Sequence, residues 1–266
     1  MTRARNWMSN LILHTPAPLR SLRKLPVFGD LLHRISHRLL PAEEKTWGLI
    51  EVGPAKGLWL ELNPRTGRNY LRGETESEVQ RILEARLHSG MVFYDLGANI
   101  GLFTLLAARL VGASGKVFSF EPDPEVALRL RRNIERNGFQ NITLVETGVW
   151  SASGQINFVT ADPSSPDRGI GKFVAGEGGS SGKPIECVSL DDFMSSAPAP
   201  DWIKCDVEGA EVEVFHGAEK LLGSHRPWII CEMHSEKNNR DSREFLSGFG
   251  YSIQTVDANH ILALPS

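Results

Sequence analysis

The sequence predicts an α/β protein in which a mostly parallel sheet carries helices on both faces. From residue 91 onward, short apolar runs alternate with segments whose apolar residues recur at helical spacing. Acidic residues and glycines follow directly after several of those apolar runs. The chain ends in "YSIQTVD" and "HILALP", which predict a terminal antiparallel hairpin. In sheets of this kind, ligands bind beyond the carboxyl ends of the strands.

The composition is that of an ordinary globular protein of 266 residues, with 41% hydrophobic residues and a formal net charge of −3. This balance does not indicate a general polyanion binder. No run approaches the roughly 18 apolar residues of a membrane span. The three cysteines, Cys187, Cys205 and Cys231, show no CxxC spacing. We therefore expect reduced thiols in a cytoplasmic protein rather than disulfides or zinc ligands.

The first 46 residues predict a basic helical segment. Residues 1–40 contain six Arg and one Lys against a single acid, and "PVFGDLLHRISHRLLP" has apolar residues at helical spacing. Such a helix could contact a membrane surface or an acidic partner, or it could pack on the domain with its basic face in solvent. The sequence leaves these alternatives open.

Residues 47–90 predict a hairpin and a helix that lead into the core. "WGLIEV" and "GLWLEL" are strand-like and flank a turn at residues 53–57. "TESEVQRILEARLHSG" follows, in which Thr75 and Glu78 match a capping box and Gly90 marks the end of a helix.

Strands and helices then alternate through residues 91–266. "MVFYDLG", "KVFSFEP" and "ITLVET" predict the first three strands of the sheet. Between the first two lies a helix with an apolar face, formed by Phe103, Leu106, Ala107 and Leu110. Between the second and third, Asp123 and Pro124 predict the N-cap and first residue of a helix that ends at Gly138.

The alternation of strands and helices is interrupted at residues 150–200 and then resumes. "GQINFVT" and "PIECVSL" predict extra strands, and residues 161–184 between them form a Gly/Ser/Pro-rich loop that we expect to be mobile or to act as a lid. "DWIKCDVEG" and "PWIICEMHS" then predict two more parallel strands. The helices expected after them are "AEVEVFHGAEKLLG" and "SREFLSGFG".

The segment "DLGANIG", residues 95–101, has the chemistry of a ligand-binding turn. Gly97 allows a sharp turn and a close approach of the backbone to a ligand. Gly101 stands at the start of a helix, where free backbone N–H groups favour a carboxylate or phosphate. Asp95, at the strand end, suits a cationic amine. An anion at the helix and a cation near the carboxylate together describe an amino-acid moiety.

Glu121 ends the neighbouring strand, 26 positions beyond Asp95. An acid at this place can accept hydrogen bonds from both hydroxyls of a ribose. An amino-acid moiety and a ribose in one pocket indicate S-adenosyl-L-methionine. The dinucleotide alternative requires GxGxxG, and "GANIG" lacks the third glycine at that spacing.

Several segments together resemble the FkbM-type methyltransferase family. They are "VFYDLGANIGLFTLLAARLVGASGKVFSFEPDPE", "NIERNGFQNITLVETGV", "SLDDF", "IKCDVEGAEVEVFHGAEKLL" and "RPWIICEMH". The resemblance runs from about residue 50 to the end. It implies the class I methyltransferase (Rossmann-like) sheet with helices on both faces, with residues 91–266 as the S-adenosylmethionine-dependent methyltransferase domain. It also implies methyl transfer to a hydroxyl, commonly on a sugar, a glycan or a polyketide-like small molecule.

The resemblance also implies roles for particular residues. Those expected at the methionine end of the cofactor are Asp95, Gly97, Asn99 and Gly101. Glu121 is expected at the ribose, with Pro122 shaping the turn beside it. Gly148, after the third strand, falls where such folds usually pass the adenine.

Asp206, Glu208 and His234 are the candidate catalytic residues, because they follow the two strands expected to face the acceptor. A sugar hydroxyl needs a base to remove its proton, and the ordinary pKa of histidine suits that task. Asp206 could take the proton instead, orient the acceptor, or merely cap the next helix. His234 could likewise be a structural histidine, and Glu208 could be a first-turn helix charge.

The remaining acids allow two further interpretations. Glu211, Glu213 and Glu219 are most simply solvated charges on a helix face. Asp206 and Glu232 could supply two oxygens to a hard cation, but two acids without a third ligand make a thin metal site, and we expect no metal.

The sequence therefore predicts an S-adenosylmethionine-dependent O-methyltransferase with a small-molecule or glycan acceptor. Methylation of a macromolecule, RNA or protein, is the alternative enzyme reading, although no nucleic acid is expected because no RRM, KH or zinc signature is present. A non-catalytic S-adenosylmethionine-binding partner protein is the third reading. It would not need the acceptor-side group of Asp206, Glu208, Glu232 and His234.

Overall fold

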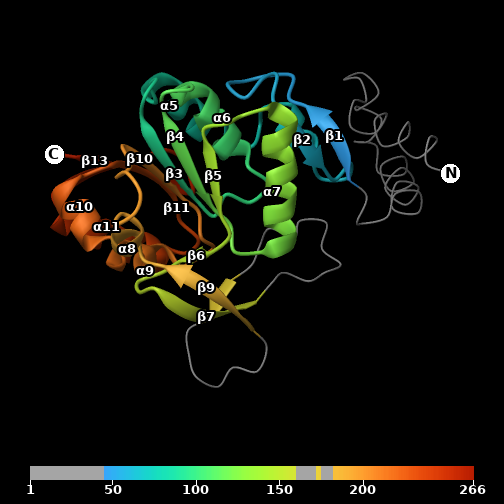
Figure 1. Cartoon of the computed structure of the whole chain (residues 1–266). Helices are drawn as coiled ribbons and strands as arrows, with labels where there is room; N and C mark the ends of the chain where they lie inside the picture. Colours follow the sequence, from blue (N-terminus) through green and yellow to red (C-terminus); the bar gives the residue numbers. More distant parts are fainter. Residues whose placement is uncertain (1–44, 160–171, 175–181) are drawn as a thin grey trace, which may run out of the picture.

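The computed structural model describes residues 45–159, 172–174 and 182–266, and its centre is a seven-stranded sheet. In spatial order the strands are β12 (Tyr251–Thr255), β13 (His260–Pro265), β11 (Trp228–Glu232), β10 (Trp202–Cys205), β3 (Val92–Leu96), β4 (Lys116–Phe120) and β5 (Ile142–Val145). The last five are parallel, while β13 pairs antiparallel with β11 and with β12 (Figure 1). The predicted parallel sheet and terminal hairpin are confirmed.

Helices cover both faces of this sheet and bury two separate cores. The first core includes residues of α5 (Ser77–Arg86) and α6 (Leu102–Val111). The second includes residues of α8 (Leu190–Phe193), α9 (Glu211–His216), α10 (Glu219–Ser224) and α11 (Glu236–Gly248). Among the described residues, no helix is both long enough and apolar enough to cross a membrane.

Side chains of the buried strands alternate strictly between the two cores. Phe93, Val117, Trp202 and Ile230 belong to the first core, and the next residue of β3, β4 and β10 belongs to the second. Because side chains along a strand alternate with a period of two, the residues two positions beyond face the first core again. These are Asp95, Ser119, Lys204 and Glu232. The α6 side of the sheet therefore carries a polar row at its carboxyl edge.

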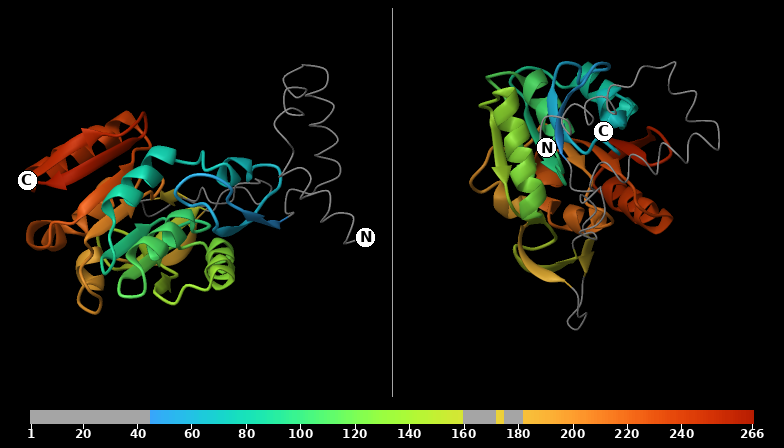
Figure 2. Two further views of the ribbon diagram at one scale, coloured as in Figure 1. Left: turned by 90° about the horizontal axis from the view of Figure 1, so that it is seen from above. Right: turned by 90° about the vertical axis from the view of Figure 1, so that its right-hand side faces the viewer.

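The predicted N-terminal hairpin, β1 (Thr46–Leu49) with β2 (Trp59–Leu62), is confirmed and packs on α7 (Pro124–Asn137). Buried Asn133 of α7 contacts both the hairpin and the turn before α6. Its Oδ1 accepts from the Glu61 N–H of β2, and its Nδ2 donates to the Ile100 carbonyl. The hairpin is thereby tied to the turn before α6. Figure 2 shows it on the opposite side of the molecule from the C-terminal strands.

Several predicted boundaries are confirmed and others are wrong. Asp123 caps α7 by accepting from two backbone N–H groups, as predicted. The predicted capping box of Thr75 and Glu78 is wrong, because the N-cap of α5 is Glu76 and its side chain makes no capping hydrogen bond. The helix α5 ends at Arg86, before the predicted Gly90. A short helix that was not predicted, α4 (Arg68–Leu71), precedes it. The helix expected over "AEVEVFHGAEKLLG" is divided into α9 and α10. At the break, a Cβ on Gly217 would lie 2.2 Å from the Trp150 carbonyl oxygen.

A second, smaller sheet follows β5 in the chain. Its order is β6 (Gly148–Val149), β9 (Lys183–Val188), β7 (Gly154–Val159) and β8 (Lys172–Val174), and it contains the two extra strands that the sequence predicted. The basic segment of residues 1–44 and most of the loop at residues 161–184 lie outside the described residues, so those predictions are not tested.

Candidate active site

The site is built where strand order reverses, between β3 and β10. β4 and β5 follow β3 on one side, and β10 and β11 lie on the other. In α/β sheets this switch point opens a crevice at the carboxyl ends of the strands. Pairing sets Lys204 beside Asp95, Asp95 beside Ser119, and Glu232 beside His260. The sequence-predicted residues Asp95, Glu121, Asp206 and His234 all lie at this edge.

The "DLGANIG" turn is fixed by packing as well as by backbone angles. Gly97 has a φ of 76°, and a Cβ there would lie 1.8 Å from the backbone oxygen of Asp206. Gly101 has a φ of 91°, and its Cβ would lie 2.2 Å from Leu130 of α7. Each glycine therefore has a structural reason that does not involve a ligand. Asn99, with a φ of 49°, is a strained residue between them.

Glu121 holds this turn against the start of α7. Its Oε2 accepts from the Asn99 N–H and its Oε1 from the Asp123 N–H, both at 2.9 Å. Burial raises the pKa of Glu121 to about 8, and the two backbone hydrogen bonds only partly offset it. Pro122 follows at the turn. Gly148 is a buried residue of β6, which pairs with β9 in the smaller sheet.

Asp95 is fully enclosed beneath the turn. Its Oδ2 accepts from the hydroxyl of Thr104 in α6 at 2.6 Å, and that hydroxyl lies 2.9 Å from the hydroxyl of Ser119. Burial raises the pKa of Asp95 to about 6, against the opposing effect of Lys204. Its Oδ1 is buried and has no hydrogen-bond partner among the described residues.

His234 is clamped by carboxylates on both ring nitrogens. Nδ1 lies 2.8 Å from Oε1 of Glu211, while Nε2 lies 3.6 Å from Asp206 and 3.4 Å from Glu208. Burial alone would lower the pKa of His234. The hydrogen bond and charge of Glu211, with the charges of Asp206 and Glu208, outweigh it and raise that pKa to about 9.

The interpretation of Glu211 as a solvated helix charge is wrong. Its side chain is 0% exposed, and Oε1 also accepts from the Gly209 N–H at 3.0 Å. The helix α9 has Ala210 as its N-cap, so Asp206 is not the capping residue. Glu208 adopts a φ of 55°, a second strained position next to His234.

Four residues of the site were not singled out from the sequence: Glu76, Lys204, Asp257 and His260. Nδ1 of His260 lies 2.8 Å from Asp257, and its Nε2 lies 3.2 Å from Glu76 and 3.8 Å from Glu232. Nζ of Lys204 lies 3.7 Å from Oε2 of the same Glu76. The signal for Lys204 was present in the sequence, because a charged residue inside a buried strand requires partners.

Two overlapping groups among the described residues could hold a metal ion. They are Glu76, Glu232 and His260, and Asp206, Glu232 and His234. The sequence had suggested two of these ligands, Asp206 and Glu232. His234 supplies the third ligand that this pair lacked in the sequence argument.

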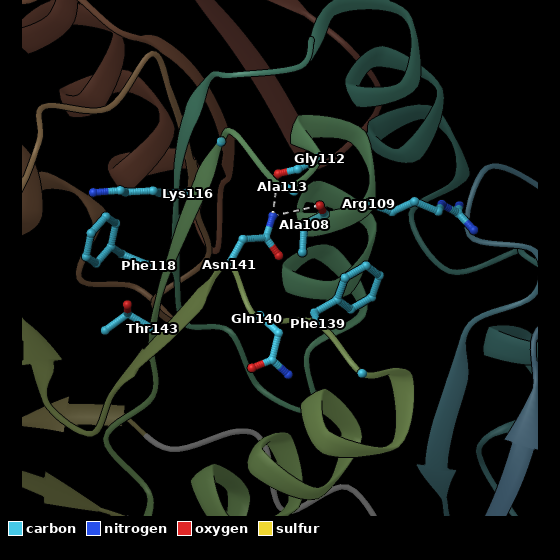
Figure 3. A pocket seen from close by; sticks show the side chains of 12 residues that line it. Ala108, Arg109, Gly112, Ala113, Lys116, Phe118, Phe139, Gln140, Asn141 and Thr143 are labelled. Atoms are coloured by element: carbon cyan, nitrogen blue, oxygen red, sulfur yellow. Dashed lines mark hydrogen bonds between the residues drawn. The ribbon is translucent and has the colours of Figure 1, made fainter.

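A cavity of about 580 Å³ lies away from this edge. Its lining comes from α6, the amino end of β4 and the turn before β5, and it includes Lys116, Phe139 and Asn141 (Figure 3). Asn141 donates to the carbonyls of Ala108 and Gly112 there. The cavity is therefore at the opposite end of the strands from the polar row.

Comparison with known proteins gives consistent matches. The family model of the methyltransferase FkbM domain matches residues 95–253. The hexuronic acid methyltransferase AglP of Haloferax volcanii is 32% identical over 191 residues, which cover 71% of this chain and 74% of that protein. The methyltransferase sdnD of Sordaria araneosa is 30% identical over 51% of this chain and 63% of its own length.

A solved structure shows the same fold. The crystal structure of methyltransferase FkbM from Methylobacillus flagellatus matches with a TM-score of 0.51 and 20% sequence identity, over 67% of this chain. This chain spans 44% of the length of that protein.

We predict that Glu211→Gln lowers the pKa of His234, because the amide keeps a hydrogen-bond acceptor at Nδ1 but removes the charge that stabilises the imidazolium. NMR titration of the imidazole resonances measures this pKa, which is about 9 with Glu211 present. Glu213→Gln, on the same helix, is the matched control and should leave it unchanged. An identical His234 pKa in the Glu211→Gln variant would contradict the assigned pairing.

Proposed function

Because the chain belongs to the FkbM methyltransferase family, and so is an S-adenosylmethionine-dependent methyltransferase, we propose that it methylates a hydroxyl of a sugar, a glycan or another small molecule. The observation that carries the proposal is the environment of the two ring nitrogens of His234. Its Nδ1 is held by a buried carboxylate, and its Nε2 faces two acids at the edge of the sheet where the cofactor turn ends.

The residues at the switch point fit the cofactor. α6 begins at Gly101 without a side-chain cap, which suits a carboxylate at its first turn. Oδ1 of Asp95, which has no hydrogen-bond partner in the described part of the chain, suits an ammonium group, and Glu121 suits the ribose hydroxyls. Asn99 and Gly97 would complete the methionine end, while Pro122 and Gly148 would lie toward the adenine. When bound, the cofactor supplies an electrophilic methyl group on a positively charged sulfur.

The chain's own residues can remove the hydroxyl proton. With Nδ1–H donated to Glu211, the neutral ring of His234 presents Nε2 as the proton acceptor. A base placed in this way contributes about 10²–10⁴-fold to a reaction of this kind. Asp206 and Glu208 lie on the same side of the ring and would orient the acceptor hydroxyl. Much of the remaining rate enhancement would come from that positioning.

The likeness to a hexuronic acid methyltransferase supports a sugar acceptor. The half-buried carboxylates at the edge, Glu76, Asp206 and Glu232, are suitable hydrogen-bond acceptors for the several hydroxyls of such a molecule. No described feature favours RNA or protein as the acceptor, and these remain outcomes of the experiment below.

Above about pH 8, where Glu121 is ionised, we predict that Glu121→Gln weakens S-adenosylmethionine binding by about 10–100-fold, the effect of losing one hydrogen bond to a charged group. The amide would also turn a donor toward the N–H of Asn99 or Asp123. Isothermal calorimetry measures the affinity, and Glu135→Gln, exposed on α7, is the control. Wild-type affinity in Glu121→Gln would remove this residue from the cofactor site.

The function itself is tested with methyl-labelled S-adenosylmethionine, the purified protein and fractionated extract of the host. We expect base-stable label in a sugar or small-molecule fraction, because an ether resists mild alkali. Label in RNA or protein, or label released by base as from a carboxyl ester, would contradict hydroxyl methylation while leaving the cofactor site intact.

A further inference from the structure

Lys204 is a buried cation at the centre of the acceptor edge. Its side chain is 4% exposed, inside the four-residue strand β10 whose every residue is buried. A charged group is rarely enclosed in this way unless it is paired. The ammonium must therefore have a specific electrostatic role.

The partners of Lys204 come from four different elements. Nζ lies 3.0 Å from Oδ2 of Asp206, at the end of β10, and 3.7 Å from Oε2 of Glu76, at the start of α5. Asp95 is its register neighbour on β3, and the ring of Phe103 in α6 lies beneath the ammonium, 4.6 Å from Nζ to the centroid. One cation thus connects the cofactor side of the crevice with the acceptor side.

These contacts suit the ammonium form of Lys204. The carboxylates of Asp206 and Glu76 lie at ion-pair distance from Nζ, and the face of the Phe103 ring also attracts a cation. The side chain is therefore a paired positive charge of the site.

The same contacts bear on metal binding. Each of the two groups that could hold an ion includes one carboxylate already paired with Lys204, Glu76 in the first and Asp206 in the second. An ion bound by either group would share that carboxylate with the ammonium and would be repelled by it. At a few ångströms in a partly buried site, water screens such repulsion only weakly, so the ammonium opposes binding of the ion.

We propose that Lys204 is the built-in cation of the acceptor site, occupying the electrostatic place of a divalent metal and positioning Asp206 beside Nε2 of His234. The effect of Lys204 on turnover rests on the proposed function, since Lys204 acts through Asp206. The effect of Lys204 on metal binding does not depend on the proposed function.

The experiment compares wild type, Lys204→Met and the control Lys237→Met, whose lysine is a 79% exposed residue of α11 paired with Asp241. Manganese binding is measured by electron paramagnetic resonance without acceptor, cofactor affinity by calorimetry, and turnover with and without EDTA. We expect wild type and control to bind no manganese specifically and to ignore EDTA. Lys204→Met should gain a manganese site and, at saturating cofactor, lose about 100-fold in turnover, as a misplaced catalytic group does.

Two results would overturn the proposal. One is that the wild type binds manganese specifically, loses turnover in EDTA and recovers it when manganese is added. The other is a folded Lys204→Met protein with wild-type turnover and no gained manganese site. If Lys204→Met does not fold, the wild-type manganese and EDTA measurements still decide. If no hydroxyl acceptor is found, the manganese comparison stands alone, so failure of the proposed function is distinguishable from failure of this proposal.

Discussion

The pairing of β10 between β3 and β11 is the constraint on which the site depends. Its register puts Lys204 beside Asp95 and brings the backbone oxygen of Asp206 against Gly97. A buried ammonium must be neutralised, and the carboxylates that do so come from the strand ends and from α5. A shift of one residue would turn Lys204 into the opposite core, among hydrophobic side chains. The register of β10 therefore sets both the charge balance around Lys204 and the shape of the crevice.

Much of the fold could be predicted because its signals are local. Alternation of apolar runs predicted the parallel sheet, the Asp123–Pro124 pair predicted the start of α7, and Asp95 with Glu121 indicated the cofactor. Long-range contacts set what was missed. The sequence alone does not show which of Glu211, Glu213 and Glu219 is buried, because all three belong to one predicted helix. Glu211 is the one that meets His234, a residue 23 positions later in the chain. The β11–β13 pairing likewise brings His260, 28 residues later, beside Glu232.

The glycine turn shows how one motif can have more than one physical cause. Gly97 and Gly101 are required by β10 and α7, so glycines alone would not identify a ligand site. The stronger indications are the unpartnered oxygen of Asp95 and the strained backbones of Asn99, Glu208 and Glu76, which gather at the same edge of the sheet. Strain of this kind persists where surrounding contacts fix it, and it clusters at functional sites.

The central claim is that neutral His234 removes the acceptor proton, and the pH dependence of kcat/KM for the acceptor, measured at saturating S-adenosylmethionine, tests it most directly. With the cofactor site filled, this constant reports the ionisation of the groups that meet the acceptor and not the binding of the cofactor. A base acts only when unprotonated, so with the pKa of His234 at about 9 the constant should rise with pH and level off above that value. His234→Gln should remove the rise. A flat profile in wild type, or the same rise in His234→Gln, would contradict the account.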